Sequence, residues 1–273
     1  MVVQHNLTAM NASRQLGITT TSQAKTTEQL SSGYKINRAA DDAAGLTISE
    51  KMRSQIRGLT QASDNAQDAV SLVQTAEGAL AEVHSMLQRM NELAVKSSNG
   101  TNTSADRDAI QKEVKALVSE IDRVQQSTQF NTLNLLDGTF SGGRALQVGA
   151  ANTSSQRILV SIKNMNASSL GIGSVTLSTI GTARTAIGLI TKAIAQVSAQ
   201  RSKLGAVQNR LEHTIANLDN VVENTTAAES QIRDTDMADT MVNYSKNNIL
   251  SQAGQSMLAQ ANQATQGVLS LLG

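Results

Sequence analysis

The residues that could do chemistry in this chain are few and scattered. His5, His84 and His213 are far apart, none belongs to an H-E-x-x-H pair, and cysteine is absent. This pattern favours neither a zinc hydrolase helix nor a thiolate metal cage. The glycine-rich run "GTFSGGR" (138–144) lacks the G-K-[ST] ending of a phosphate-binding loop. We therefore expect no catalytic residue, no metal and no cofactor, and we predict that the protein is not an enzyme.

Adjacent carboxylates occur once in a suggestive setting, in "DDAAG" (41–45). Neighbours in sequence point apart on a helix, so Asp41 and Asp42 are unsuited to act as an acid–base pair. Their position before an alanine-rich run indicates a helix start, because acidic residues favour helix N-termini, or a pairing between subunits.

Composition describes the elements that must carry any function. The 273 residues include two Phe, two Tyr, no Trp and no Pro, which favours long helices packed along thin aliphatic seams over a compact core. The formal net charge is +1, with acidic and basic residues interspersed, so we expect neither a nucleic-acid partner nor an anionic bilayer. No apolar run of about eighteen residues occurs, and the N-terminus lacks the pattern of a secretory signal; we expect no membrane insertion.

Heptad repeats mark the interior of the chain. A stripe from Ala66 to Ala94 predicts a helix over about 46–98, and "NGTNTSADRD" (99–108) predicts a turn with Thr103 or Ser104 as the next cap. A second stripe from Ile110 to Val124 then folds back on the first. A third runs from Ile187 to Val222, interrupted at two seam positions by Arg201 and Gln208.

Residues 138–182 differ from the helices around them. In "RILVSIK", Ile158, Val160 and Ile162 alternate as in a strand, and "RALQVGA" (144–150) could pair with it across "ANTSSQ". We predict a mainly α fold of long antiparallel coiled-coil helices, with paired N- and C-terminal helices and a small β-hairpin region at mid-chain.

The two ends of the chain resemble each other. Arg14 is the only formally charged side chain in residues 1–24, and none follows Lys246. Both ends carry weak apolar stripes at helical spacing, too thin for an isolated helix pair to be stable, so we predict a self-assembling helical homopolymer. The residues expected to carry self-assembly are Val3, Leu7, Met10, Leu250, Met257, Ala261, Val268, Leu269 and Leu272.

Two long segments carry a family resemblance: "LSSGYKINRAADDAAGLTISEKMRSQIRGLTQASDNAQDAVSLVQTAEGALAEVHSMLQRMNELAVKSSNGT" near the start, and "GAVQNRLEHTIANLDNVVENTTAAESQIRDTDMADTM" with "KNNILSQAGQSMLAQANQATQGVLSLL" near the end. Together with "SEIDRVQQSTQFNTLNLLDG" they resemble bacterial flagellin, the structural subunit of the filament that drives swimming. The resemblance implies that 1–45 and 232–273 form the filament inner core, 46–137 and 183–231 the coiled-coil rod, and 138–182 its β-hairpin. Many flagellins insert large variable domains at mid-chain; here only a short segment joins the arms, which implies a thin, smooth filament.

The resemblance also implies partners and a location. The chain is expected to be secreted by the type III flagellar export apparatus to an extracellular filament, assembled under a flagellar cap protein and joined to the hook by hook-filament junction proteins. An export chaperone is expected to cover its C-terminal helix, 232–273.

A host Toll-like receptor for flagellin is a further implied partner. In "LQRMNELAV" (87–95), Arg89 and Leu93 align with receptor-contacting residues of the family, and Glu113 aligns with a third. Arg89 and Leu93 are four residues apart, so we expect them on one exposed helix face with Glu113 beside them. The alternative is that Arg89 and Glu113 form an ordinary surface pair.

Two other protein classes share parts of this pattern. A chemoreceptor-type signalling coiled coil also uses Ala- and Gln-rich heptads, but its mid-chain tip should be helical and charged. A hook-filament junction protein would share the weakly charged terminal helices, but would match "INRAADDAAGL" less continuously.

Overall fold

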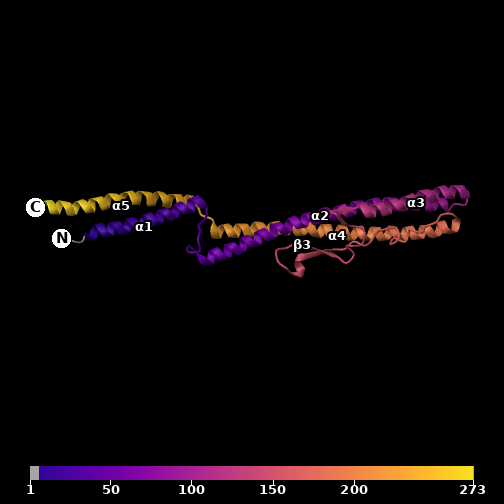
Figure 1. Cartoon of the computed structure of the whole chain (residues 1–273), viewed down its shortest axis with the longest axis horizontal. Coiled ribbons are helices and arrows are strands. Elements are labelled where there is room, and N and C mark those ends of the chain that lie inside the picture. Colours follow the sequence, from indigo (N-terminus) through magenta and orange to yellow (C-terminus); the bar gives the residue numbers. More distant parts are fainter. Residues whose placement is uncertain (1–5, 273) are drawn as a thin grey trace. The chain divides into compact units, whose positions relative to one another are not determined.

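The computed structural model describes the backbone of residues 6–272 and the side chains of residues 6–263 (Figure 1). The described chain forms two compact units, a terminal unit of residues 1–56 and 223–273 and a central unit of residues 57–222. The helices are α1 (Leu7–Ser32), α2 (Ala43–Ser97), α3 (Ser104–Ser127), α4 (Ile180–Arg233) and α5 (Met237–Leu272), and the strands are β1 (Gln129–Phe130), β2 (Leu133–Asn134), β3 (Arg144–Gln147) and β4 (Arg157–Val160).

The central unit is built on the seam that the heptads predict. Leu80, Val83 and Leu87 of α2 are fully buried, and they belong to one apolar cluster with Val114 of α3 and Val197 of α4. Of the predicted stripe positions, Val70, Leu117, Val124, Ile187, Ile194 and Ile215 are partly buried at the edge of this cluster. The long helices therefore fold back on one another as expected.

The turn between α2 and α3 is fixed by side-chain caps. Thr103 is the N-cap of α3 and accepts a hydrogen bond from the backbone N–H of Asp106, whose carboxylate accepts one in return from the N–H of Thr103 (2.9 Å). This capping box satisfies two otherwise unpaired donors of the first helical turn. Arg107 donates from Nε to the carbonyl of Ser97 (3.1 Å) and from Nη2 to that of Asn99 (3.0 Å), which ties α3 to the end of α2.

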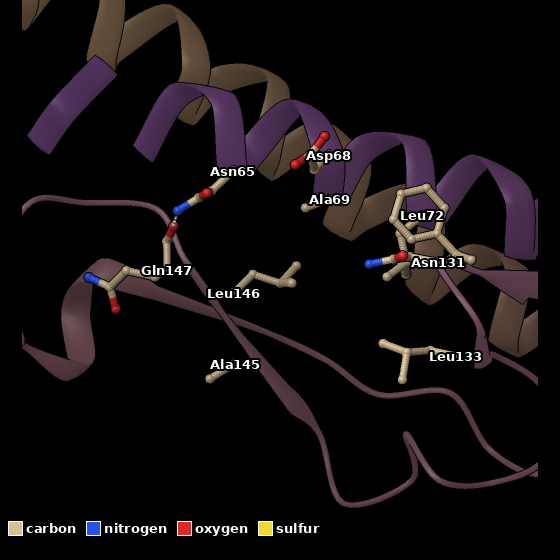
Figure 2. A pocket seen from close by; sticks show the side chains of 10 residues that line it. Asn65, Asp68, Ala69, Leu72, Asn131, Leu133, Ala145, Leu146 and Gln147 are labelled. Carbon is tan, nitrogen blue, oxygen red and sulfur yellow. Dashed lines mark hydrogen bonds between the residues drawn. The ribbon is translucent and has the colours of Figure 1, made fainter. Parts of the chain in front are cut away.

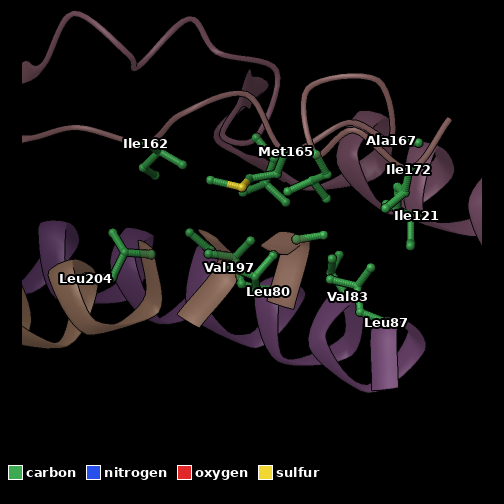
Figure 3. Close-up of a cluster of buried hydrophobic side chains, with 14 of the residues drawn as sticks. Leu80, Val83, Leu87, Ile121, Ile162, Met165, Ala167, Ile172, Val197 and Leu204 are labelled. Carbon is green, nitrogen blue, oxygen red and sulfur yellow. The ribbon is translucent and has the colours of Figure 1, made fainter. Parts of the chain in front are cut away.

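The predicted hairpin between 144–150 and 157–163 is confirmed. β3 pairs antiparallel with β4, with Leu146 opposite Ile158, and Ile158 and Val160 are buried. The following segment has no regular structure, yet Ile162, Met165 and Ile172 are almost fully buried against α2 and α4 (Figure 3). Besides the predicted hairpin, the region 138–182 therefore also supplies side chains to the apolar core.

A second, smaller hairpin was not predicted from the sequence. Phe130 of β1 lies opposite Leu133 of β2, and the two residues between them, Asn131 and Thr132, have φ of 47° and 64°. Positive φ at both central positions is typical of the tightest hairpin turn, where glycine is usual. The sequence "FNTL" contains no glycine, so its turn signal is weak.

In the terminal unit α1 lies beside α5, as predicted from their similar composition (Figure 1). Asn6 donates from Nδ2 to the carbonyl of Ala261 (2.8 Å), and Asn247 donates from Nδ2 to Oγ of Ser22 (3.1 Å). The first bond places the start of α1 next to the last part of α5 whose side chains the structure describes, and the second shows that the two helices run antiparallel.

The compact units divide inside α2, after Ile56, and inside α4, after Val222. The predicted segment boundaries at 45/46 and 231/232 instead follow the ends of the helices. α2 and α4 run unbroken through the division, so no linker marks it in the sequence. The assignment of segments to filament layers stays a prediction.

Candidate assembly and recognition surfaces

The contact between α1 and α5 combines small side chains with a few larger ones, such as the half-buried Leu16 and Leu258. α1 has no buried residue, and on α5 the buried or half-buried positions facing inward include Ser251, Gly254 and Ala261. A Cβ at Gly254 would lie 3.2 Å from Cδ1 of Leu16, so the two helices approach closely there. Such a seam buries little apolar area, and it stabilises the pair weakly.

Several large apolar side chains of α1 and α5 are exposed to solvent. Leu7 and Met10 are 65% and 63% exposed, and Met257 is 60% exposed. Further exposed apolar side chains of α1 and α5 are Ile18, Met237, Met241, Val242, Ile249 and Leu250. By helical spacing Val242, Ile249, Leu250 and Met257 share one face of α5, and an exposed apolar face is typical of a surface that packs against another molecule.

The predicted assembly residues fall into three groups. Leu7, Met10, Leu250 and Met257 belong to the exposed set, whereas Ala261 is half-buried on the face of α5 that contacts α1. The expected single stripe on α5 is therefore two neighbouring stripes, one against α1 and one exposed. Val3 lies outside the described residues, and Val268, Leu269 and Leu272 lie outside the described side chains.

Ile18 and the exposed residues between 237 and 249 were missed from the sequence. Ile18 follows Leu7 by eleven positions, which is about three helical turns, so extending the same stripe would have found it. The segment 237–249 was missed because charged residues interrupt its apolar spacing.

The loop between α1 and α2 holds the terminal unit together. Gly33 closes α1 in the left-handed conformation (φ 76°), and Lys35 donates its N–H to the carbonyl of Arg233 (2.7 Å). Asp41 pairs with Lys25 (2.9 Å), and this hydrogen bond is the main cause of a pKa of Asp41 below its ordinary value. Oδ1 of Asp42 accepts from the N–H of Gly45 (2.9 Å) at the start of α2, so the predicted helix start is confirmed.

Arg89 and Glu113 lie side by side on the central unit, as the sequence predicts. Arg89 donates from Nε to Oε1 of Glu113 (3.0 Å) and pairs through Nη1 with Glu92 (3.1 Å). The hydrogen bonds from Arg89 to Glu92 and then to Glu113 raise the pKa of the guanidinium above its ordinary value. The side chains of Arg89 and Glu113 are about half exposed, so this charged cluster is accessible in the free chain.

The expected exposure of Leu93 is wrong. Its side chain is 3% exposed and belongs to the same buried cluster as Met90, Ala94 and Ile110. Leu93 follows Met90 by three positions and extends the buried stripe of α2 sideways to the returning α3. Four-residue spacing from Arg89 therefore does not place the two side chains on one exposed face.

The described residues contain no group of three His, Cys, Asp or Glu side chains that could hold a metal ion. Nε2 of His84 lies 3.1 Å from Nε2 of Gln88. No described helix combines the length and the apolarity needed to cross a membrane.

A hollow of about 270 Å³ lies between α2 and the two hairpins (Figure 2). Asn65 donates to the carbonyl of Gln147 across it (3.4 Å), and Leu72, Leu133 and Leu146 line it. Asp68 is the one charged residue in its lining. Catalysis needs convergent charged or nucleophilic groups, which this lining does not offer.

The fold is that of a mainly α protein of long packed helices, with large apolar side chains exposed on α1 and α5. Two family profiles match the chain, the bacterial flagellin N-terminal helical region over residues 3–141 and the bacterial flagellin C-terminal helical region over residues 187–272. The chain is 54% identical over 272 residues to flagellin of Halalkalibacterium halodurans and 50% identical over 305 residues to flagellin of Bacillus subtilis, covering 100% of both proteins and of itself. The chain belongs to the bacterial flagellin family.

Solved structures agree with this assignment. The crystal structure of Bacillus cereus flagellin superposes with a TM-score of 0.51 and 32% identity, over 57% of this chain and 88% of that one. A putative flagellar hook-associated protein of Vibrio parahaemolyticus gives a TM-score of 0.59 at 14% identity, over 71% of this chain and all of that one, and this likeness concerns the fold alone. The protein is a structural subunit of the bacterial flagellar filament and not an enzyme; flagellins polymerise with copies of themselves into that extracellular filament.

Proposed function

We propose that the chain polymerises through the exposed apolar side chains of α1 and α5, which pack against other copies in the inner core of the filament. The observation that carries this proposal is the pair of helices itself: α1 buries no residue in this unit, and Leu7, Met10 and Met257 face solvent. Burying an apolar side chain of this size contributes about 1.5–3 kcal/mol. Residues 1–45 and 232–273 thus form the core, and the coiled-coil helices surround it.

Removal of residues 247–273 tests this proposal, and we expect the shortened chain to remain a soluble monomer when filament seeds are added. Filaments formed by the shortened chain would contradict the proposal.

A point variant makes the test sharper. Met257→Glu places a charge on the exposed apolar face and should raise the concentration needed for assembly, whereas Gln255→Glu, an exposed polar position two residues away, should change it little.

We further propose that the exposed face of α5 is covered before assembly. An export chaperone would mask the C-terminal helix within 232–273, the type III flagellar export apparatus would secrete the chain unfolded, and the cap protein and hook-filament junction proteins would contact it in the filament. The exposed Val242, Ile249 and Met257 support this proposal, because an uncovered apolar face promotes premature association. Titration of the full chain with the chaperone should show binding that is lost without residues 247–273; equal binding would refute the masking role.

A second proposed function is recognition by a host Toll-like receptor at Arg89 and Glu113. The observation that favours it is their accessible cluster with Glu92 on the rigid α2–α3 pair. Arg is a frequent interface hot spot because its guanidinium combines charge with a planar contact surface. The buried side chain of Leu93 would support this surface indirectly, by packing the part of α2 that carries Arg89 against the core.

Receptor signalling by point variants tests this second function. Arg89→Ala should reduce signalling at an unchanged unfolding midpoint. Arg123→Ala is a matched control, because Arg123 is also exposed and pairs with Glu120 three residues before it (2.5 Å) on the same helix hairpin. Full signalling by Arg89→Ala, or an equal loss with Arg123→Ala, would remove the proposed contact.

A further inference from the structure

Although the net charge of the whole chain is near zero, one long segment carries basic residues and no acidic ones. Residues 138–211 contain no Asp or Glu and eight basic residues: Arg144, Arg157, Lys163, Arg184, Lys192, Arg201, Lys203 and Arg210. Arg201 pairs with Glu77 of α2 (2.7 Å). The other seven take part in none of the salt bridges found among the described residues. The segment therefore offers basic groups that their own chain leaves without acidic partners.

Three of these groups form a row along α4. Lys203 follows Lys192 by 11 positions and Arg210 follows Lys203 by 7, so all three lie close to one face of the helix. They are exposed, and the row spans 18 positions, about 27 Å at 1.5 Å per residue. Beside Lys203 the surface is hollowed by about 580 Å³, and Lys163 lies in the lining of this hollow with Asn164. We call Lys192, Lys203 and Arg210 the cationic row.

An acidic row of the same length lies on α2. Asp64, Asp68 and Glu82 are exposed, share one helical face and also span 18 positions. None of them takes part in a salt bridge among the described residues. Both rows lie wholly within the central unit.

The antiparallel register of α2 and α4 brings the two rows to similar levels. Ser63 donates to Asp219 (3.2 Å) and Arg201 donates to Glu77 (2.7 Å), so positions on the two helices correspond in reverse order. Within one copy, this register places the acidic row beside the cationic row. The ends of the two rows are shifted from each other along the helices by roughly six residues, about 9 Å. Two parallel copies displaced by that amount would place Asp64 opposite Arg210 and Glu82 opposite Lys192.

We propose that in the assembled filament the cationic row of one copy lies against the acidic row of a neighbouring copy. A contact between two different surfaces of identical subunits can repeat without limit, as a filament requires. The two rows have opposite charge and equal length, which favours this register over other registers. In any other register some of the charges would stay unpaired. The proposal rests on the polymerisation of the chain, and it concerns a surface separate from the apolar faces of α1 and α5.

Charge reversal of each row tests the contact in the full chain. One variant carries Lys192→Glu, Lys203→Glu and Arg210→Glu, the second carries Asp64→Lys, Asp68→Lys and Glu82→Lys, and the third carries all six changes. The first two variants should each raise the critical concentration of seeded assembly roughly tenfold or more in about 0.05 M salt. The critical concentration of the third variant, with all six substitutions, should return close to that of the unaltered chain. The differences should shrink in about 0.5 M salt, where charges are screened.

A control variant separates row pairing from net charge. Lys96→Glu, Lys112→Glu and Lys115→Glu change three exposed basic residues outside the rows by the same total charge and should leave the critical concentration within about twofold. The proposal is overturned if this control assembles as poorly as the first variant. It is also overturned if the variant with all six substitutions keeps a raised critical concentration. It is also overturned if the first variant assembles normally and loses binding to a sulfated polysaccharide instead. Loss of the α1–α5 contact is distinguishable, because the chain without 247–273 should fail to assemble at either salt concentration.

Discussion

Replacing Leu93 by Ala is the sharpest test of whether this residue belongs to the core or to a recognition surface. Its side chain is 3% exposed, so the substitution removes three carbon atoms from the apolar cluster of the central unit. At about 0.8 kcal/mol for each buried carbon the lost transfer free energy is about 2.4 kcal/mol. The remaining cavity brings the expected loss in the free energy of unfolding to about 3–4 kcal/mol.

Val95→Ala is the matched control, two positions further along the same helix. Val95 is 51% exposed, and the change removes two carbon atoms that are only half buried, so we expect a loss below about 1 kcal/mol. Urea unfolding of the monomeric full-length chain, followed by circular dichroism, measures both. With a slope of about 2 kcal/mol per molar urea, the midpoint of the central unit should fall by about 1.5–2 M for Leu93→Ala.

Equal midpoint shifts for the two variants would refute the burial of Leu93. The comparison also bears on receptor assays, because a chain weakened by this amount loses signalling through unfolding. Contact with the receptor is therefore better judged from Arg89, whose side chain is about half exposed.

Three further substitutions test local structure by urea unfolding. Thr103→Ala removes the cap of α3 and should cost about 1 kcal/mol, while Ser104→Ala, the alternative cap from the sequence, should change stability by less than about 0.5 kcal/mol; the opposite ranking would misplace the cap. Thr132→Gly relieves a β-branched residue at φ 64° and should stabilise the central unit by roughly 0.5–1 kcal/mol, and a loss of stability would exclude strain at this turn. The pKa of Asp41 is lowered in the folded chain, mainly by its hydrogen bond with Lys25, so its contribution is present above the ordinary Asp pKa and lost as the pH falls through the lowered folded value. Asp41→Asn should therefore destabilise the terminal unit near neutral pH and much less in strong acid; a deficit independent of pH would show that the charge is not the cause.

The helices and the main hairpin were predictable because their signals are local. Seam positions such as Leu80 and Leu204 repeat every three or four residues, and Ile158 and Val160 alternate, so each pattern specifies its own element. Even the polar interruption at Arg201 was visible as a break in the repeat. Its partner Glu77 was not, because that pairing depends on the register between helices more than a hundred residues apart.

The irregular segment after β4 shows what periodicity cannot predict. Ile162, Met165 and Ile172 have no common period, yet all three are buried (Figure 3). Their backbone is held by distant groups: Ile162 donates to the carbonyl of Phe140 (3.3 Å), and Met165 to that of Leu136 (3.1 Å). Burial here follows from tertiary contacts, and the same is true of Leu93, which is buried in the apolar cluster of the central unit.

The two units differ in whether their large apolar side chains are buried within the chain. In the central unit the large side chains of α2, α3 and α4 meet inside one chain, so its folding free energy is supplied internally. In the terminal unit α1 buries no residue and leaves Leu7 and Met10 in solvent, which supports the proposal that contact with other copies adds stabilisation. We therefore expect the central unit to fold within one chain, and the terminal unit to gain stability when the chain joins the polymer. The charged rows fit the same division, because weak, screened pairs on an already folded surface can select the register of neighbours without trapping a wrong one.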